Sequence, residues 1–211
     1  MGWRGPAGLL VLALAGSGLG FALSVLDRNG PVGSGVAEPV AAEGPSLPVD
    51  PPSPTAADPD DPPLQPGITL TEGSLGTGKF MITFPVPEGW LTNVNATNEA
   101  KWKEPGTSNN SYVMRVEQIT SQDVTIEQAV DARVAFLRTE QDAVVVEARG
   151  TDSLEYTYRS NEGNARHSFM RWIDTDADGQ ADVEIVVHGR EQDVPGTSDL
   201  VARVAAGLRS S

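Results

Sequence analysis

The chain of 211 residues carries a formal net charge of −14 and contains no cysteine. An acidic surface repels phosphate backbones, so we expect no nucleic-acid partner. The lack of cysteine excludes disulfides, thiolate metal sites, thiol nucleophiles and an acylated lipoprotein anchor. The charge is divided unevenly, with +1 over residues 1–26, −6 over 27–67 and −9 over 68–211, which indicates three parts of different character.

Residues 7–26 form an unbroken run of 20 residues without a charged side chain. A helix of that length, at about 1.5 Å per residue, covers about 30 Å, the thickness of the hydrocarbon core of a bilayer. Arg4 precedes this run and acidic residues dominate after it, so the positive-inside rule places residues 1–6 in the cytoplasm. The sequence therefore predicts a single-pass signal-anchor helix in the cell membrane, with the C-terminal part extracellular.

The alternative for the N-terminal run is a signal peptide that is cleaved, after which the chain is secreted. Gly18-Leu19-Gly20 fits the small-x-small pattern of a cleavage site, but the length of the apolar run favours an anchor. Gly16 and Gly20 also form a G-x-x-x-G pair, the pattern by which two membrane helices approach closely as a homodimer. Small residues are common in such segments, so this pair is a poor indicator of dimerisation by itself.

Residues 27–67 have the composition of a linker, because residues 31–66 hold 11 of the 16 prolines of the chain. Proline fixes φ and lacks an amide donor, so neither helix nor sheet propagates through such a segment. Few large apolar residues are present to offset the entropy of ordering. We expect a disordered, acidic spacer that, at about 3.1 Å per residue, holds the following domain roughly 100 Å from the bilayer.

Residues 68–211 have the composition of one folded domain. Alternating apolar residues predict strands, and Thr125 with Gln128 forms a capping box that predicts the start of a helix. Ser198 is a good N-cap for a second helix. The expected strands are 80–84, 99–104, 111–119, 143–148, 154–159, 166–173 and 183–188, and the expected helices are 125–141 and 198–208. Because strands and helices do not alternate, we expect an α+β fold with a mainly antiparallel sheet and two packed helices.

A first strand that ends in Phe84-Pro-Val-Pro-Glu-Gly-Trp90, followed by a capped helix, a meander and a terminal helix, resembles the PsbP-like fold. More narrowly, residues 76–209 are similar to exported PsbP-like domains of high-GC Gram-positive bacteria, including LpqN-like lipoproteins. This resemblance implies an αβα sandwich, export, and a binding or accessory role without a catalytic motif. The chain departs from the lipoprotein members because it has an apolar segment where they have an acylated cysteine.

The sharpest local pattern is Asp174-Thr-Asp-Ala-Asp-Gly-Gln-Ala-Asp182. Acids at every second position followed by a glycine are typical of loops that wrap oxygen ligands around calcium. The predicted ligands are the carboxylates of Asp174, Asp176 and Asp178, the backbone carbonyl of Gln180, and Asp182 directly or through water. The bidentate acid of a complete loop is missing, because Ile185 stands at its position. The simpler interpretation is an acidic hairpin loop, since Asp and Gly are ordinary turn residues.

No other catalytic constellation is evident in the sequence. The two histidines, His167 and His188, fall on neighbouring predicted strands, but no third zinc ligand accompanies them. We therefore predict a membrane-tethered, non-enzymatic binding or accessory module of the cell surface with no cofactor other than a calcium ion, and with a cell-wall or membrane-protein partner. The alternatives are a wall-associated hydrolase or transferase that uses carboxylates such as Glu155 or Glu184, and a calcium-binding surface domain.

Overall fold

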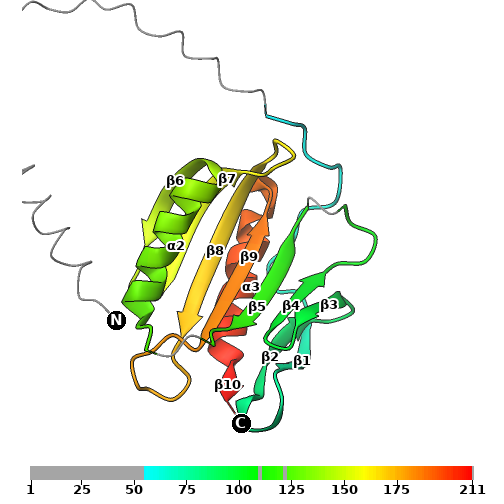
Figure 1. Ribbon diagram of the computed structural model, residues 1–211. Coiled ribbons are helices and arrows are strands. Elements are labelled where there is room, and N and C mark those ends of the chain that lie inside the picture. The colour runs from blue at the N-terminus through cyan, green and yellow to red at the C-terminus, as the bar shows by residue number, and fades with distance from the viewer. Residues whose placement is uncertain (1–54, 109–110, 121–122, 211) are drawn as a thin grey trace, which may run out of the picture. The chain divides into compact units, whose positions relative to one another are not determined.

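Two sheets and two α-helices make up the part of the chain that the computed structural model describes, residues 55–108, 111–120 and 123–210 (Figure 1). The larger sheet has seven antiparallel strands in the spatial order β3-β4-β5-β9-β8-β7-β6. Their bounds are β3 Leu91–Ala96, β4 Glu99–Lys103, β5 Val113–Gln118, β6 Asp142–Arg149, β7 Ser153–Arg159, β8 Ala165–Ile173 and β9 Val183–Gly189. The smaller antiparallel sheet has the order β1-β2-β10, with β1 Leu70–Leu75, β2 Ile82–Pro87 and β10 Arg209–Ser210.

The two helices lie on opposite faces of the larger sheet (Figure 1). Helix α2 (Ile126–Glu140) packs on one face, and α3 (Val194–Gly207) packs on the other together with the smaller sheet. Strand β9 serves both layers, since Val183 and Ile185 face α3 whereas Val186 faces α2. The predicted fold class, a mainly antiparallel sheet with two packed helices in an αβα sandwich, is confirmed. Two short 3-10 turns, η2 (Gly78–Phe80) and η3 (Glu191–Asp193), complete the described elements.

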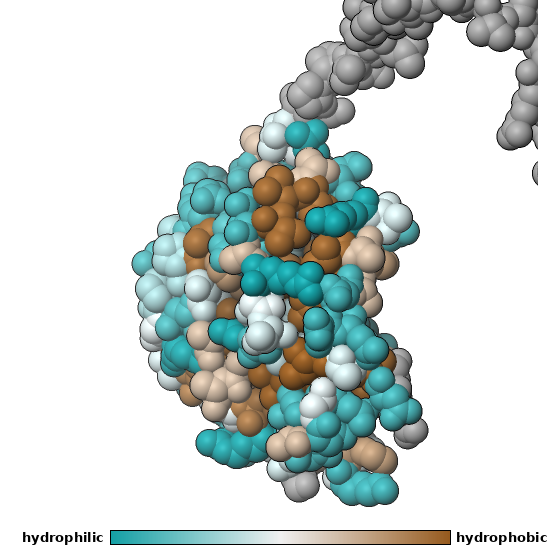
Figure 2. Space-filling model, turned by 90° about the vertical axis from the view of Figure 1, so that its left-hand side faces the viewer, coloured by the Kyte–Doolittle hydropathy of each residue, from teal (hydrophilic) through white to brown (hydrophobic). Residues whose placement is uncertain are grey.

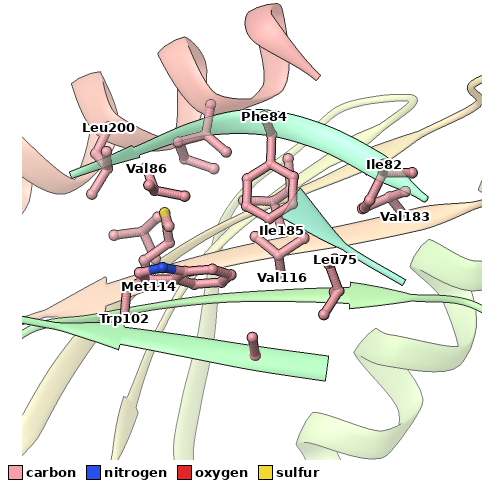
Figure 3. Close-up of a cluster of buried hydrophobic side chains, with 14 of the residues drawn as sticks. Leu75, Ile82, Phe84, Val86, Trp102, Met114, Val116, Val183, Ile185 and Leu200 are labelled. Carbon is pink, nitrogen blue, oxygen red and sulfur yellow. The ribbon is translucent and has the colours of Figure 1, made fainter. Parts of the chain in front are cut away.

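The larger core lies between the two sheets and α3 (Figure 3). Phe84 of β2 meets the edge of the Trp102 ring of β4, with centroids 5.4 Å apart and planes at 88°. This edge-to-face geometry is the arrangement that aromatic quadrupoles favour. Phe84, Ile185 and Leu200 are at most 1% exposed, so this cluster joins β2, β9 and α3.

The smaller core lies under α2, where the predicted capping box is present. The Thr125 side chain accepts from the Gln128 amide at 3.2 Å, and the Gln128 side chain accepts from the Thr125 amide at 3.0 Å. The apolar stripe of the helix then buries Val130 and Leu137 against a layer that includes Trp172, which is 1% exposed. The sequence interpretation of this helix is confirmed within one residue at each end.

The second helix begins earlier than the sequence predicted. α3 starts at Val194, directly after η3, and Ser198 lies inside the helix rather than at its N-cap. Pro195 stands in the first turn, where a missing amide costs nothing because the first amides of a helix have no intrahelical partner. Strands β1, β3 and β10 were also not predicted. All six residues of β3 are exposed, so this edge strand lacks the buried alternation that reveals a strand.

The N-terminal end of the described chain corrects the predicted extent of the linker. Residues 55–66, which we call the strap, pack against the domain, and Leu64 belongs to the larger core at 4% exposure. The ordered domain therefore begins before residue 68. The disorder predicted for residues 27–54 falls outside the described residues and stays a prediction.

The remaining N-terminal predictions cannot be compared with the fold. The cytoplasmic tail at 1–6, the membrane helix at 7–26 and the glycine pair lie outside the described residues. Among the helices that are described, none has both the length and the apolar character that crossing a bilayer requires.

The open edges of the larger sheet are β3 and β6, and both have an irregular register. Val145 of β6 is 52% exposed. Figure 2 views the molecule from the side of β6 and shows apolar patches divided by hydrophilic side chains. Bulges and flanking polar groups of this kind protect an edge from pairing with other chains.

Candidate functional site

The predicted calcium loop connects β8 to β9 and lies at one end of the larger sheet (Figure 1). The C-terminal part of the loop is hydrogen-bonded to the segment that precedes α2. The Ala181 amide donates to the Val124 carbonyl at 2.9 Å, and Gln180 forms an isolated antiparallel β-bridge with Thr125. Gly179 has φ +87°, a left-handed conformation that glycine adopts without strain, so this glycine permits the tight turn of the loop. The loop is thus held at both ends by the sheet and the helix start.

The fold brings Asp174, Asp176 and Asp182 together. One carboxylate oxygen from each lies within 4.8 Å of the others, and this is the one such group of three metal-binding side chains among the described residues. Asp174 is held in place by the backbone, because its Oδ2 accepts from the Gly179 amide at 2.7 Å and its Oδ1 accepts from the Ala177 amide at 2.6 Å. Oxygen atoms gathered in this way suit a hard divalent cation such as calcium.

Two carboxylates of the loop, those of Asp174 and Asp176, have pKa values shifted in opposite directions. Hydrogen bonds from backbone amides, first of all that of Gly179, lower the pKa of Asp174. The pKa of Asp176 is raised, first by loss of solvation and then by the negative charge of Asp178. Ionisation of Asp176 is therefore opposed by its surroundings, and a cation bound at the loop would favour it.

Two predicted ligands are not part of the converging group. The Asp178 carboxylate accepts from the Gln180 amide at 2.8 Å, which closes a local turn. The Gln180 side chain accepts from the Asp123 amide at 2.8 Å, so its amide group braces the segment before α2. The prediction for Gln180 concerned its backbone carbonyl, and the roles of Gln180 and Asp178 toward a cation stay predictions.

A cavity of about 810 Å³ opens beside the loop. Its walls come from the start of α2, the β6–β7 turn and the loop itself, with Thr125, Ile126, Glu127, Arg149, Asp152 and Gly179 among them. Two charged side chains of its walls form ion pairs with neighbours: Arg149 pairs with Asp131 at 2.5 Å, and Asp152 pairs with Arg171 at 2.8 Å. The cavity is consequently a recess next to an acidic loop, with charged side chains among its walls.

The two histidines do not form a site. The β8–β9 register pairs Ser168 with His188 and His167 with Gly189, so the two imidazoles project from opposite faces of the sheet. His167 contacts Glu155 through Nε2 at 2.8 Å and Glu191 through Nδ1 at 3.4 Å. His188 lies on the α2 side, where burial and the positive charges of Arg166, Arg115 and Lys101 lower its pKa to about 4.

The two carboxylates named for a hydrolase are also on opposite faces. Glu155 is in register with Phe169, which packs with the α3 layer, whereas Glu184 is in register with Trp172, which belongs to the α2 layer. Glu184 is 5% exposed and receives Arg133 at 2.6 Å as well as Arg115. These contacts fasten α2 to β9 and β5, and the pair does not have the facing geometry of two catalytic carboxylates.

A row of polar side chains crosses the sheet beneath α2. Tyr156, Ser168 and His188 are direct neighbours on β7, β8 and β9. Ser168 is 0% exposed, so its hydroxyl is out of reach of a substrate. Burial raises the pKa of the neighbouring Tyr158 to about 12. These groups are part of the packing between helix and sheet.

Arg190 and Asp193 are the charged side chains whose placement the sequence did not indicate. Both are fully buried, and together they bind the strap. An arginine and an aspartate three residues apart are common in loops, so no local pattern marks them. Only their contacts with a segment about 130 positions away reveal what they do.

No protein-family model and no curated protein matches the chain. Two of the solved structures that resemble it are the following. The solution structure of cyanobacterial PsbP (CyanoP) from Synechocystis sp. PCC 6803 is 16% identical, covers 69% of this chain and 96% of that chain, and has a TM-score of 0.42. The crystal structure of LpqN, involved in cell envelope biogenesis of Mycobacterium tuberculosis, is 12% identical, covers 66% of this chain and 90% of that chain, and has a TM-score of 0.39. Their names are those of the PsbP-like and LpqN-like proteins that the sequence resembles.

Proposed function

We propose that the chain is a membrane-tethered, extracytoplasmic binding or accessory module of the cell surface, and that it is not an enzyme. The charge-free run at 7–26 and the acidic, proline-rich segment after it motivate the tether. The observation that carries the proposal is the strap. Two buried charged side chains of the domain, Arg190 and Asp193, bind the end of this proline-rich segment, and Leu64 of the segment enters the larger core, so the linker ends in a firm attachment.

The position of the strap also supports an assignment of the end of the domain that is free. The Ala56 amide donates to the Gly163 carbonyl at 2.9 Å, which places the start of the strap at the β7–β8 turn. The acidic loop follows the other end of β8, a strand of nine residues. At about 3.3 Å per residue the two ends are about 30 Å apart. The loop and the cavity beside it are thus presented away from the tether, where a cell-wall or membrane-protein partner has access.

The orientation is tested with tags on the full chain in intact, wall-stripped cells. A tag after Ser211 is expected to be digested by added protease, whereas a tag before Trp3 is expected to survive, because the predicted anchor leaves only residues 1–6 inside. Lysed cells, in which both tags are digested, are the control. Protection of the C-terminal tag would reject an extracytoplasmic domain, and release of the whole domain into the medium would favour signal cleavage.

A second candidate function is calcium binding at the loop, and the convergence of Asp174, Asp176 and Asp182 favours it. Because the bidentate ligand is missing, we expect weak affinity, about 10⁻⁴–10⁻³ M, the range of extracellular modules. At ten times the Kd, calcium is expected to stabilise the fold by about 1.4 kcal/mol.

Thermal unfolding of the chain in calcium and in chelator measures this stabilisation. Asp176→Ala is expected to abolish the stabilisation by calcium. Asp178→Ala is expected to retain a larger part of this stabilisation than Asp176→Ala does, because Asp178 is not in the converging group. Asp60→Ala, an exposed aspartate of the strap, is the matched control. Equal melting temperatures with calcium and with chelator in the wild-type chain would leave the loop as an acidic turn only.

A further inference from the structure

The strap is held by the domain in the way that a recognition domain holds a peptide. Arg190 donates from Nη1 to the carbonyl oxygens of Pro59 and Asp61, both at 2.8 Å, and from Nη2 to that of Pro62 at 3.0 Å. Proline-rich backbone does not pair its carbonyls within a sheet or a helix, so these oxygens are free to accept. One buried guanidinium therefore binds three carbonyls of an extended segment, a contact that depends on the backbone conformation more than on side chains.

Side chains of the strap add specificity. The Asp58 carboxylate accepts from Arg166 at 2.6 Å, and Arg166 is only 4% exposed. The Asp61 carboxylate accepts from the Ser108 amide at 2.8 Å and from the Ser111 hydroxyl. Two acids three positions apart are thus recognised by separate donors on the domain, and charged acceptors make the stronger class of hydrogen bond.

Leu64 is the apolar anchor of the segment. Its side chain enters the larger core beside α3, and its amide donates to Asp193 Oδ1 at 2.9 Å. Gly196 makes room for it, because a Cβ at that position would lie 2.3 Å from the Leu64 carbonyl oxygen and 2.6 Å from Leu64 Cγ. A buried anchor with polar contacts on one side is the usual anatomy of a peptide interface.

The receiving surface is organised independently of the strap. Asp193 binds Arg190 Nε through Oδ2 and Arg190 Nη2 through Oδ1, each at 2.8 Å, so the guanidinium is fixed by its own chain neighbour. Asn164, at the β7–β8 turn, donates to the Ala57 carbonyl at 2.9 Å and marks the far end of the surface. Preorganised donors lower the cost of binding a segment. We call the surface formed by Ser111, Asn164, Arg166, Arg190, Asp193 and Gly196 the strap site.

We propose that the strap site is a recognition site for an extended, acidic, proline-rich segment, and that it binds residues 56–64 of a second copy of this chain when its own strap is displaced. The cis strap is a tethered competitor at an effective concentration on the order of millimolar. The strap of a second copy therefore replaces the chain's own strap only when that strap is weakened or when the chains are crowded. This inference does not depend on the membrane anchor or on the calcium loop.

The test uses the full chain in detergent micelles and a fluorescent peptide with the sequence of residues 55–67. Leu64→Ala in the chain is expected to increase peptide affinity at least about tenfold over wild type, because it weakens the cis competitor and leaves the strap site intact. Fluorescence anisotropy measures the affinity, and circular dichroism verifies the fold of each variant. Asp58→Asn is the milder variant to use if Leu64→Ala does not fold. Asp60→Asn changes an exposed acid of the same segment and is expected to behave as wild type.

Three further controls distinguish specific recognition of the peptide from non-specific binding. Adding Gly196→Ala to the weakened chain is expected to abolish peptide binding, although alanine is the better helix former, because its Cβ would overlap Leu64 of the peptide. A peptide with alanine in place of its leucine, and a scrambled peptide of the same composition, are expected not to bind. The proposal would be overturned if a folded, strap-weakened chain did not bind the peptide at millimolar concentration. It would also be overturned if that chain bound the scrambled peptide equally well.

Discussion

Replacing Asp193 by alanine is expected to lower the free energy of unfolding by about 4 kcal/mol, because it leaves the buried charge of Arg190 unpaired. Asp193 and Arg190 are both 0% exposed. The single carboxylate of Asp193 accepts hydrogen bonds from the Arg190 amide, from the Arg190 guanidinium and from the Leu64 amide. The substitution thus leaves a guanidinium without its counter-charge and loosens the strap at the same time. Urea titration at neutral pH measures the effect.

Asp199→Ala is the matched control for this substitution. Asp199 is an aspartate of α3 that also binds the N-terminal segment, by accepting from the Gly67 amide at 2.8 Å, and its ion pair with Arg203 is 3.2 Å long. Because both side chains of that pair are about one-third exposed, the loss is expected to stay below about 1 kcal/mol. If the two substitutions cost the same, the buried Arg190–Asp193 pair does not have the role assigned to it.

The stability of the domain is expected to fall between about pH 6.5 and pH 4 because of His188. Its pKa is about 4 in the folded chain, against a usual value of 6.5. Between these values the unfolded chain binds a proton that the folded chain does not, so the contribution is fully present above pH 6.5 and is lost as the pH falls. Lowering the pKa from 6.5 to about 4 corresponds to at most about 3–4 kcal/mol of stability.

Carboxylates of the domain also titrate at the lower end of this range, so the measured quantity is the difference between wild type and His188→Gln. The variant is expected to match the wild-type stability at pH 7.5 within about 1 kcal/mol, because both side chains are then neutral. Below pH 6 the wild type is expected to lose stability faster than the variant. Parallel pH profiles for the two chains would show that His188 stays solvated in the folded state.

The parts of the fold that could be predicted from sequence are those with local signals. Alternation marks β7, in which Leu154 and Tyr156 are buried between less buried neighbours, and the capping box at Thr125 marks the start of α2. The exposed strand β3 has no such alternation, so it could not be predicted. The start of α3 was placed too late because Pro195 was not weighed as a first-turn residue.

The strap shows why composition alone is insufficient for a proline-rich segment. Its prolines and acids are typical of disorder, and no local interaction opposes that interpretation. What orders it is a set of long-range partners, Arg190, Asp193 and the space left by Gly196, which no pattern in the sequence connects to residues 55–66. The acidic loop was found by its spacing, but spacing did not indicate that the Asp178 carboxylate turns back to the Gln180 amide.

Hydrogen exchange at the Leu64 amide tests the docked strap most directly. This amide donates to Asp193 Oδ1 inside the domain, whereas Asp60 of the same segment is exposed. The measurement compares the two amides in the full chain under native conditions. If the strap is part of the fold, the Leu64 amide exchanges several orders of magnitude more slowly than the Asp60 amide, at a rate that follows the global stability. Exchange of both amides at the rate of an unstructured peptide would contradict the account.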